Sequence, residues 1–160
     1  MKTQTLSLGP RGESLIKSFE KLSLVAYMPT PNDQPTIGWG HTGKDVKIGD
    51  TITKEMAEIM FTKDIEWAEN SVRHKQAILT QSMFDALVSL VFNVGPGCLT
   101  DDSTIGGNLP TLEFSNSGGY FRAWAGFALW RKQGGKDLLG LARRRAKEME
   151  LFLEDGIPGA

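Results

Sequence analysis

The stretch from residue 27 to residue 49 constrains the fold of this chain more than any other part. It contains three prolines and four glycines, together with Asn32 and Asp33. Proline lacks the backbone donor that a helix needs, and glycine weakens helix interiors, so most of the stretch is not helical. Small and large residues alternate over residues 36–41, which is typical of a short strand. We therefore expect a small, irregular antiparallel sheet here.

Before and after this stretch, apolar residues recur at the spacing of a helix. This spacing predicts helices over residues 10–22, from Thr53 as N-cap to about residue 72, and over 81–92, 120–130 and 139–153. Gly134 and Gly135 break the chain before the last of these helices. We expect residues 81–92 to form the central buried helix. For two other helices the expected inward residues are Met56, Ile59, Met60 and Trp67, and Ala142, Ala146, Met149 and Phe152.

The order of these elements predicts an α+β fold that is mostly helical. A small N-terminal lobe with the antiparallel sheet spans about residues 23–52. A larger C-terminal helical lobe spans about 73–155 and includes the N-terminal helix. A chain of 160 residues with 40% hydrophobic and 23% charged residues has the composition of a globular protein. We interpret residues 1–160 as a single domain.

Cysteine, histidine and hydropathy exclude several classes. A single cysteine, Cys98, allows no internal disulfide and fits a reducing compartment. Two histidines without a His-Glu-x-x-His motif lead us to expect neither a metal nor another cofactor. No apolar stretch approaches the roughly 20 residues of a membrane helix, and residues 1–5 are not followed by the apolar core of a signal peptide.

The net charge of −1 hides an asymmetry. Residues 120–150 carry eight Lys or Arg against three acids, an excess of +5. Such a basic stretch predicts attraction to a polyanion, such as nucleic acid, a cell-wall polymer or anionic lipid. A solvated helix face with local ion pairs explains it equally well. We expect no nucleic-acid partner, because the chain has no reading module and a pI near 6.1.

Glu20 is the first candidate for chemistry. It follows the apolar face of the first predicted helix and stands directly before the predicted sheet. A carboxyl group leaving an apolar face can hold its proton and act as a general acid. A surface glutamate paired with Lys17 or Lys21 would explain the same position.

Three ordered motifs carry a resemblance to a known family. Phe19-Glu20 and Tyr27 precede TIGWGHT at residues 36–42. Q-x-x-FDALVS-x-x-FNVG follows at residues 81–95, and GL-x-x-RR-x-x-E-x-x-LF at residues 140–152. From about residue 14 to residue 153 the chain thus resembles the phage-type lysozymes, the endolysin muramidases of glycoside hydrolase family 24.

The resemblance implies a lysozyme-like fold and hydrolysis of peptidoglycan. The bond cut would be the β-1,4 bond between N-acetylmuramic acid and N-acetylglucosamine, with lysis of the host cell as the result. Glu20 would be the general acid, and Thr36 would help to hold the attacking water. His41 would stabilise the hairpin through an ion pair. Candidate substrate contacts are Trp39, Gln81, Asn93 and Arg144, although Trp39 could instead cover the sheet and Asn93 could close a helix end.

The second carboxyl group departs from the family pattern. The family places an aspartate, or a cysteine, two positions after the tyrosine and six before the threonine, where this chain has Pro29 and Thr30. The segment from Tyr27 to Thr36 is also one residue longer than in the family. Asp33 is the nearest acid and is our candidate for the second catalytic carboxylate. Local hydrogen bonding within a turn is its alternative role.

Two alternatives to hydrolysis stay open. A lytic transglycosylase needs the acid but no group that activates water, and a catalytically silent wall-binding protein could use the same fold. The missing export signal predicts accumulation in the host cytoplasm until the membrane opens, followed by action in the periplasm at the cell wall. The resemblance implies that a holin opens the membrane. We expect a monomer with peptidoglycan as its partner.

Overall fold

The computed structural model describes residues 6–111 and 118–159, so residues 1–5, where an export signal would begin, lie outside the described part. The chain divides into two compact units. The sheet unit is Ile16–Trp67, and the helical unit comprises Met1–Leu15 and Ala68–Ala160. Helices α1 (Pro10–Glu20) and α2 (Lys54–His74) each contribute residues to both units. The interpretation as a single domain stays a prediction.

The sheet unit contains the predicted antiparallel sheet. Its strands β1 (Ser23–Tyr27), β2 (Thr36–Gly38) and β3 (His41–Thr42) lie in the order β1-β2-β3. Ser23 pairs with Gly38 and Tyr27 with Thr36, so the register shifts within β1. Such an irregularity is expected beside a proline-rich connection. A small core of Ala26, Ile37 and Val46, packed against Ile52 and Met60, holds the sheet.

Helix α2 begins where the sequence predicts, but its buried face is different. The Oγ1 atom of Thr53 accepts a hydrogen bond from the backbone N–H of Met56 at 3.2 Å, which caps the helix. The predicted inward residues Met56, Ile59 and Trp67 are 48%, 59% and 42% exposed. Met60, the fourth predicted residue, does pack against the core. The assignment was wrong for the other three because it followed the largest side chains, whereas two alanines belong to the stripe. The buried residues are Ala57, Phe61, Ile65, Ala68 and Val72.

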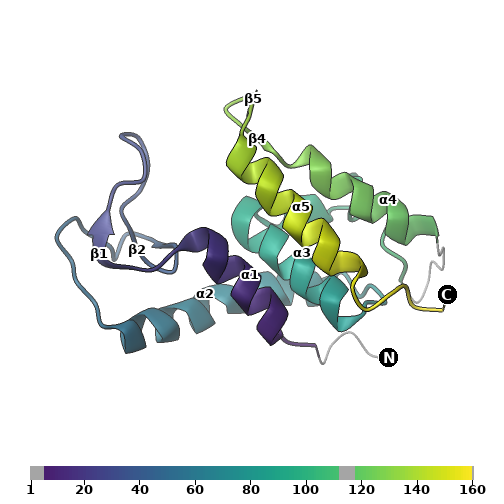
Figure 1. The fold of residues 1–160 in the computed structure, drawn as a ribbon, viewed down its shortest axis with the longest axis horizontal. Coiled ribbons are helices and arrows are strands. Elements are labelled where there is room, and N and C mark those ends of the chain that lie inside the picture. Colours follow the sequence, from purple (N-terminus) through teal and green to yellow (C-terminus); the bar gives the residue numbers. More distant parts are fainter. Residues whose placement is uncertain (1–5, 112–117, 160) are drawn as a thin grey trace. The chain divides into compact units, whose positions relative to one another are not determined.

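The helical unit is built on α3 (Gln81–Val94), the predicted central helix. Every residue from 82 to 91 is buried. The helix ends at Gly95, whose φ of +86° suits glycine and whose N–H donates to Val91 O. The short 3₁₀ helix η2 (Pro96–Leu99) follows. Helix α5 (Leu139–Leu153) packs along α3 in Figure 1.

Helix α4 (Gly118–Gly126) and the 3₁₀ helix η3 (Phe127–Leu129) complete the helical unit against α5. The rings of Phe127 and Phe152 meet edge to face, with centroids 5.5 Å apart. Together the two units give an α+β fold that is mostly helical with small antiparallel sheets, which confirms the predicted fold class. No helix in the described part of the chain has the length and apolar character that crossing a membrane requires.

A two-stranded hairpin occupies the place where only a break was predicted. Strands β4 (Lys132–Gln133) and β5 (Lys136–Asp137) pair across Gly134 and Gly135. These glycines have φ values of +57° and +77°. Two-residue hairpin turns of this kind need a positive φ at both positions, so the two glycines form the turn.

The buried face of α5 also differs from the prediction. Ala146 is exposed, whereas Arg144, Arg145 and Glu148 are buried beside Leu151 and Phe152. The prediction is confirmed for Phe152 and wrong for Ala146. An apolar inward face was expected, but charged side chains can be buried when they pair with one another. Hydropathy alone does not reveal such pairing.

Candidate active site

The carboxyl group of Glu20 lies against the turn between β2 and β3. Glu20 is the last residue of α1 and is half-buried. Its Oε2 atom is 2.5 Å, and its Cδ atom 3.1 Å, from the position that a Cβ atom would take at Gly40. Gly40 has a φ of +80°. Glycine suits this position for two reasons: it adopts the left-handed backbone conformation, and it leaves room for the carboxyl group.

Thr36 lies at the start of β2 and is only 5% exposed. It pairs with Tyr27 on β1 and with Thr42 on β3. Its hydroxyl group donates to the carbonyl oxygen of Gln34 at 3.2 Å. A hydroxyl that donates in this way keeps its lone pairs as acceptors. Thr36 and Gly40 are thus held by one hairpin.

Asp33 lies in an exposed turn of the β1–β2 connection. Its backbone N–H donates to Thr30 O at 3.1 Å, and its Oδ1 atom accepts from the backbone N–H of Gln34 at 2.9 Å. The connection therefore turns back at Asp33, as its catalytic role would require. The alternative role, a local hydrogen bond, is filled as well. The catalytic role of Asp33 stays a prediction.

Trp39 is held by charged residues of two helices. Its Nε1–H donates to Oε1 of Glu58 at 3.0 Å, and the other carboxylate oxygen of Glu58 pairs with Nζ of Lys17 at 2.6 Å. The same Nζ lies 5.2 Å from the Trp39 ring centroid and 4.9 Å from that of Phe61. The hydrogen bond from Lys17 holds the pKa of Glu58 below its usual value. The sequence did not predict Glu58, because it is 19 and 41 positions from its partners.

His41 forms the ion pair that the sequence predicts. Its Nδ1 atom is 2.7 Å from Asp64 and its Nε2 atom is 3.1 Å from Asp45. Burial alone would lower the pKa of His41, but hydrogen bonds to both carboxylates outweigh it and raise that pKa. Burial raises the pKa of Asp64, and the hydrogen bond from His41 lowers that of Asp45. The group joins the strand β3 to α2.

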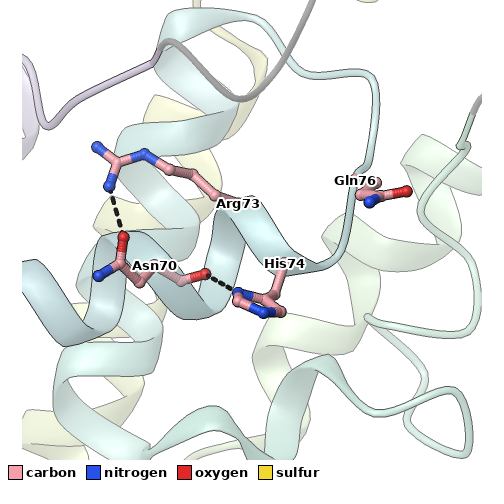
Figure 2. A pocket seen from close by; sticks show the side chains of 4 residues that line it. All are labelled: Asn70, Arg73, His74 and Gln76. Atoms are coloured by element: carbon pink, nitrogen blue, oxygen red, sulfur yellow. Dashed lines mark hydrogen bonds between the residues drawn. The ribbon is translucent and has the colours of Figure 1, made fainter.

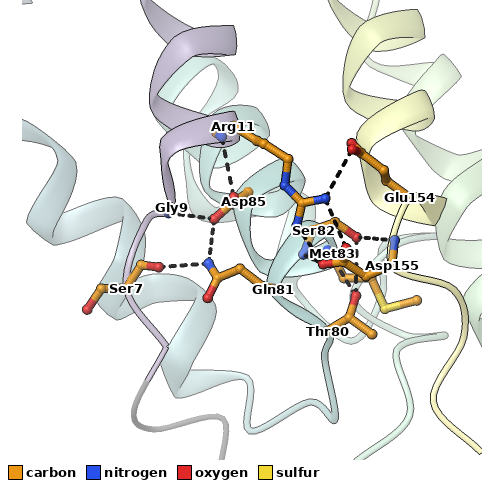
Figure 3. Close-up of polar contacts among 11 residues, drawn as sticks. Ser7, Gly9, Arg11, Thr80, Gln81, Ser82, Met83, Asp85, Glu154 and Asp155 are labelled. Carbon is orange, nitrogen blue, oxygen red and sulfur yellow. Dashed lines mark hydrogen bonds and ion pairs between the residues drawn. The ribbon is translucent and has the colours of Figure 1, made fainter.

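Gln81, a predicted substrate contact, lies at the N-terminal segment of the helical unit (Figure 3). Its Nε2 atom donates to Ser7 O at 2.8 Å and to Oδ1 of Asp85 at 2.7 Å. Asp85 also accepts from the backbone N–H groups of Gly9 and Gly12, at 2.9 and 3.3 Å. Burial raises the pKa of Asp85, against the effect of these hydrogen bonds. The substrate role of Gln81 stays a prediction, and its observed role is to hold the N-terminal segment.

Asn93 and Arg144, two further predicted contacts, belong to a buried charged network. Asn93 Oδ1 accepts from Nη2 of Arg145 at 2.8 Å. Arg144, 4% exposed, donates to Glu148 Oε1 at 3.2 Å and to Ser89 O at 3.3 Å. Burial raises the pKa of Glu148, and the two guanidinium groups oppose that rise. The observed bond of the Asn93 side chain thus reaches α5 and does not close the end of α3, and both substrate roles stay predictions.

A cavity of about 330 Å³ lies at the C-terminal end of α2 (Figure 2). Asn70, Arg73, His74 and Gln76 line it. Arg73 donates to Asn70 Oδ1 at 2.9 Å, and His74 Nδ1 lies 3.2 Å from Asn70 O. Arg73 and His74 thus bond to the last turns of α2.

His, Cys, Asp and Glu are the residue types that could hold a metal ion, and Cys98 is the one thiol of the sequence. Over residues 6–111 and 118–159, no three His, Cys, Asp or Glu side chains gather as metal ligands. Cys98 is fully buried, and its Sγ donates to Gly95 O at 3.3 Å. Burial raises the pKa of this thiol to about 12. A thiol in that state is a poor nucleophile.

This chain is similar to known proteins in sequence and in structure. The model of the family described as Phage lysozyme matches residues 17–148. The endolysin of Bacillus phage PZA is 40% identical over 149 residues, which cover 92% of this chain and 55% of that protein. The endolysin of Salmonella phage P22 is 36% identical over 153 residues, covering 92% and 99%. The chain spans about half the length of the first relatives it matches.

A solved structure extends the likeness to three dimensions. The muramidase domain of SpmX from Asticaccaulis excentricus has 33% sequence identity and a TM-score of 0.73. The alignment covers 92% of this chain and 98% of that domain. The similarity is therefore one of fold as well as of sequence.

Proposed function

Because this chain belongs to the phage lysozyme family, we propose that it hydrolyses peptidoglycan at the β-1,4 bond between N-acetylmuramic acid and N-acetylglucosamine. The observation that carries the proposal is the Glu20 carboxyl group, which lies against Gly40 in the turn of the TIGWGHT motif. A half-buried carboxyl group at the end of a helix, fixed by a glycine turn, suits a general acid. The relatives named endolysin and muramidase support the substrate class.

In the proposed reaction Glu20 donates its proton to the leaving glycosidic oxygen. A water molecule attacks the anomeric carbon from the opposite side and loses its proton to Asp33. The Thr36 hydroxyl, which donates to Gln34 O, uses its lone pairs to orient that water. An inverting reaction of this kind needs roughly 6.5–9.5 Å between the two carboxyl groups.

The experiment that tests this proposal compares the wild type with Glu20→Gln on purified peptidoglycan. The amide keeps the shape of the side chain but has no proton to donate, so lysis is expected to fall by about 10²–10⁴-fold. Thermal unfolding of both proteins serves as the control for folding. Clearing of cell walls by folded Glu20→Gln at the wild-type rate would refute the assignment of the acid.

A lytic transglycosylase is the second candidate, and one observation favours it. Pro29 and Thr30 occupy the positions where the family has its second acid. Mass spectrometry of the released fragments separates the two reactions, because hydrolysis leaves reducing N-acetylmuramic ends and transglycosylation leaves anhydro ends. Binding of walls without any released fragment would instead indicate a catalytically silent protein on the same fold.

Four side chains are proposed as substrate contacts: Trp39, Gln81, Asn93 and Arg144. The indole of Trp39 offers an aromatic face, and the others offer amide or guanidinium donors suited to sugar hydroxyl and carboxyl groups. Each is also engaged within the protein. A substrate contact predicts a higher KM after substitution, whereas a purely internal role predicts lower stability.

The cellular route is proposed from the resemblance to endolysins. The protein would remain in the host cytoplasm as a monomer until a holin opens the membrane, and would then reach the wall from the periplasm. Expression with and without a holin tests this route. Lysis that starts equally early in both cultures would refute the dependence, and gel filtration with light scattering tests the monomer.

A further inference from the structure

We propose that Glu58 is a positioning residue that fixes Trp39 and thereby holds the β2–β3 turn against the Glu20 carboxyl group. The inference rests on the proposed role of Glu20 as the acid. It concerns a residue that no motif indicates and that acts through another side chain. All the residues on which it depends belong to the sheet unit.

The turn needs an external anchor because its own backbone is permissive. Gly38 and Gly40 have φ values of +65° and +80° and flank Trp39 on either side. Glycine populates many backbone conformations, so a Gly-Trp-Gly sequence does not define one geometry by itself. Trp39 carries the one large side chain of this tripeptide. The pairing of Ile37 with His41 holds the ends of the tripeptide, and the contacts of the indole add a constraint between them.

Glu58 supplies that hold with both carboxylate oxygens. Oε1 accepts from the indole Nε1–H of Trp39 at 3.0 Å, and Oε2 pairs with Lys17 at 2.6 Å. Lys17 in turn lies over the Trp39 ring, 5.2 Å from its centroid. Hydrogen bonds to a charged group are stronger than neutral ones, and the cation over the ring adds attraction. The low pKa of Glu58 keeps the acceptor charged in mildly acid solution.

The Glu58 carboxylate bonds to a residue near Glu20 on α1 and to a residue next to Gly40 in the turn. On one side Lys17 stands three residues before Glu20 in α1, which places the two on neighbouring turns of one helix face. On the other side Trp39 is bonded directly to Gly40, against which the Glu20 carboxyl group lies. A movement of the indole therefore reaches Gly40 across a single peptide unit.

The test uses Glu58→Ala, Glu58→Gln and Trp39→Phe, assayed on soluble glycan fragments with kcat and KM determined separately. Glu66→Gln is the matched control, an exposed glutamate on the same helix. A shift of the acid by a fraction of an ångström is expected to lower kcat about tenfold in Glu58→Ala, with KM within about twofold. Glu58→Gln keeps an acceptor for the indole but loses the pairing with Lys17, so a smaller loss is expected.

A double-mutant cycle separates positioning from a direct sugar contact. If Glu58 acts through Trp39, the kcat losses of Glu58→Ala and Trp39→Phe do not add in the double variant. The Trp39 indole ¹H–¹⁵N resonance, identified by its absence in Trp39→Phe, is expected to shift in Glu58→Ala and not in Glu66→Gln. This signal reports the hydrogen bond independently of activity.

Three results would overturn the inference. They are kcat of folded Glu58→Ala equal to that of the control, a loss seen in KM alone, and additive losses in the double variant. Failure of the acid assignment on which the inference rests looks different, since Glu20→Gln would then keep its activity. An inactive Glu20→Gln beside a fully active Glu58→Ala refutes the positioning role alone.

Discussion

Replacing Gly40 by alanine tests the geometry of the acid directly. The added Cβ atom would lie 2.5 Å from Oε2 of Glu20, whereas an ordinary contact begins at 3.4 Å. The carboxyl group must therefore retreat by about 1 Å, and a misplacement of that size can cost on the order of 100-fold in rate. We expect kcat to fall about 100-fold, equivalent to about 2.7 kcal/mol of activation free energy.

The substitution also strains the backbone, and the chain offers a control for that effect. An L-residue in the left-handed region costs roughly 1–2 kcal/mol, and Gly40 has a φ of +80°. Gly49, in the same unit, has a φ of +97° with no atom within 4 Å of an added Cβ. Gly49→Ala should therefore lose similar stability with its activity retained.

Both variants are to be measured by urea unfolding and by kcat on soluble glycan fragments. The comparison isolates the clash with Glu20, because backbone strain is present in both proteins. If Gly40→Ala and Gly49→Ala have kcat values within about threefold of each other, the Glu20 carboxyl group does not depend on the space at Gly40, and the reasoning fails.

Three further predictions concern other side chains. Asp33→Asn keeps an acceptor for the Gln34 N–H, so this variant should fold yet lose most lytic activity. Thr36→Ala should lose less activity than Glu20→Gln. An active Asp33→Asn that releases reducing ends would place the second carboxylate elsewhere. Because the pKa of His41 is raised, the wild type should be more stable than His41→Gln. This advantage is complete below about pH 6.5 and is lost as pH rises through the raised pKa. A difference in the free energy of unfolding in urea that does not depend on pH would contradict the charged pair. Cys98 should resist thiol reagents at pH 8 until the protein unfolds, because burial raises its pKa to about 12, and rapid labelling of the native protein would show an open site.

Local signals in the sequence predicted the elements of the fold well. The periodicity of residues 139–153 predicts α5 with the bounds that the structure shows, and Thr53 predicts the start of α2. Such signals act over a few residues, so they depend little on the rest of the chain. The buried face of a helix depends on what packs against it, and there the large apolar side chains of α2 misled the interpretation.

The candidate site was predictable only where a motif fixes it. Glu20 and Thr36 were identified through the ordered strings of the family resemblance, and the structure holds Glu20 against the turn that follows Thr36. Glu58 was missed because its contacts join residues far apart in the sequence, and no local pattern distinguishes it from a surface glutamate of an amphipathic helix. Contacts of that kind follow from the assembled fold.

Burial also changes the meaning of the basic C-terminal stretch. Its excess of positive charge includes Arg144 and Arg145, which are buried and share Glu148, so they project little field into solvent. The pairing of Lys147 with Glu150 removes another cation from the surface count. In the described part of the chain, four exposed cations of this stretch enter no ion pair with an acid: Arg122 on α4, and Lys132, Lys136 and Arg143 on the β4–β5 hairpin and the first turns of α5. Attraction to an anionic wall polymer would therefore concentrate at the hairpin end of α5 and not along the whole helix, because exposed charges act only over about 10 Å at 0.1 M salt.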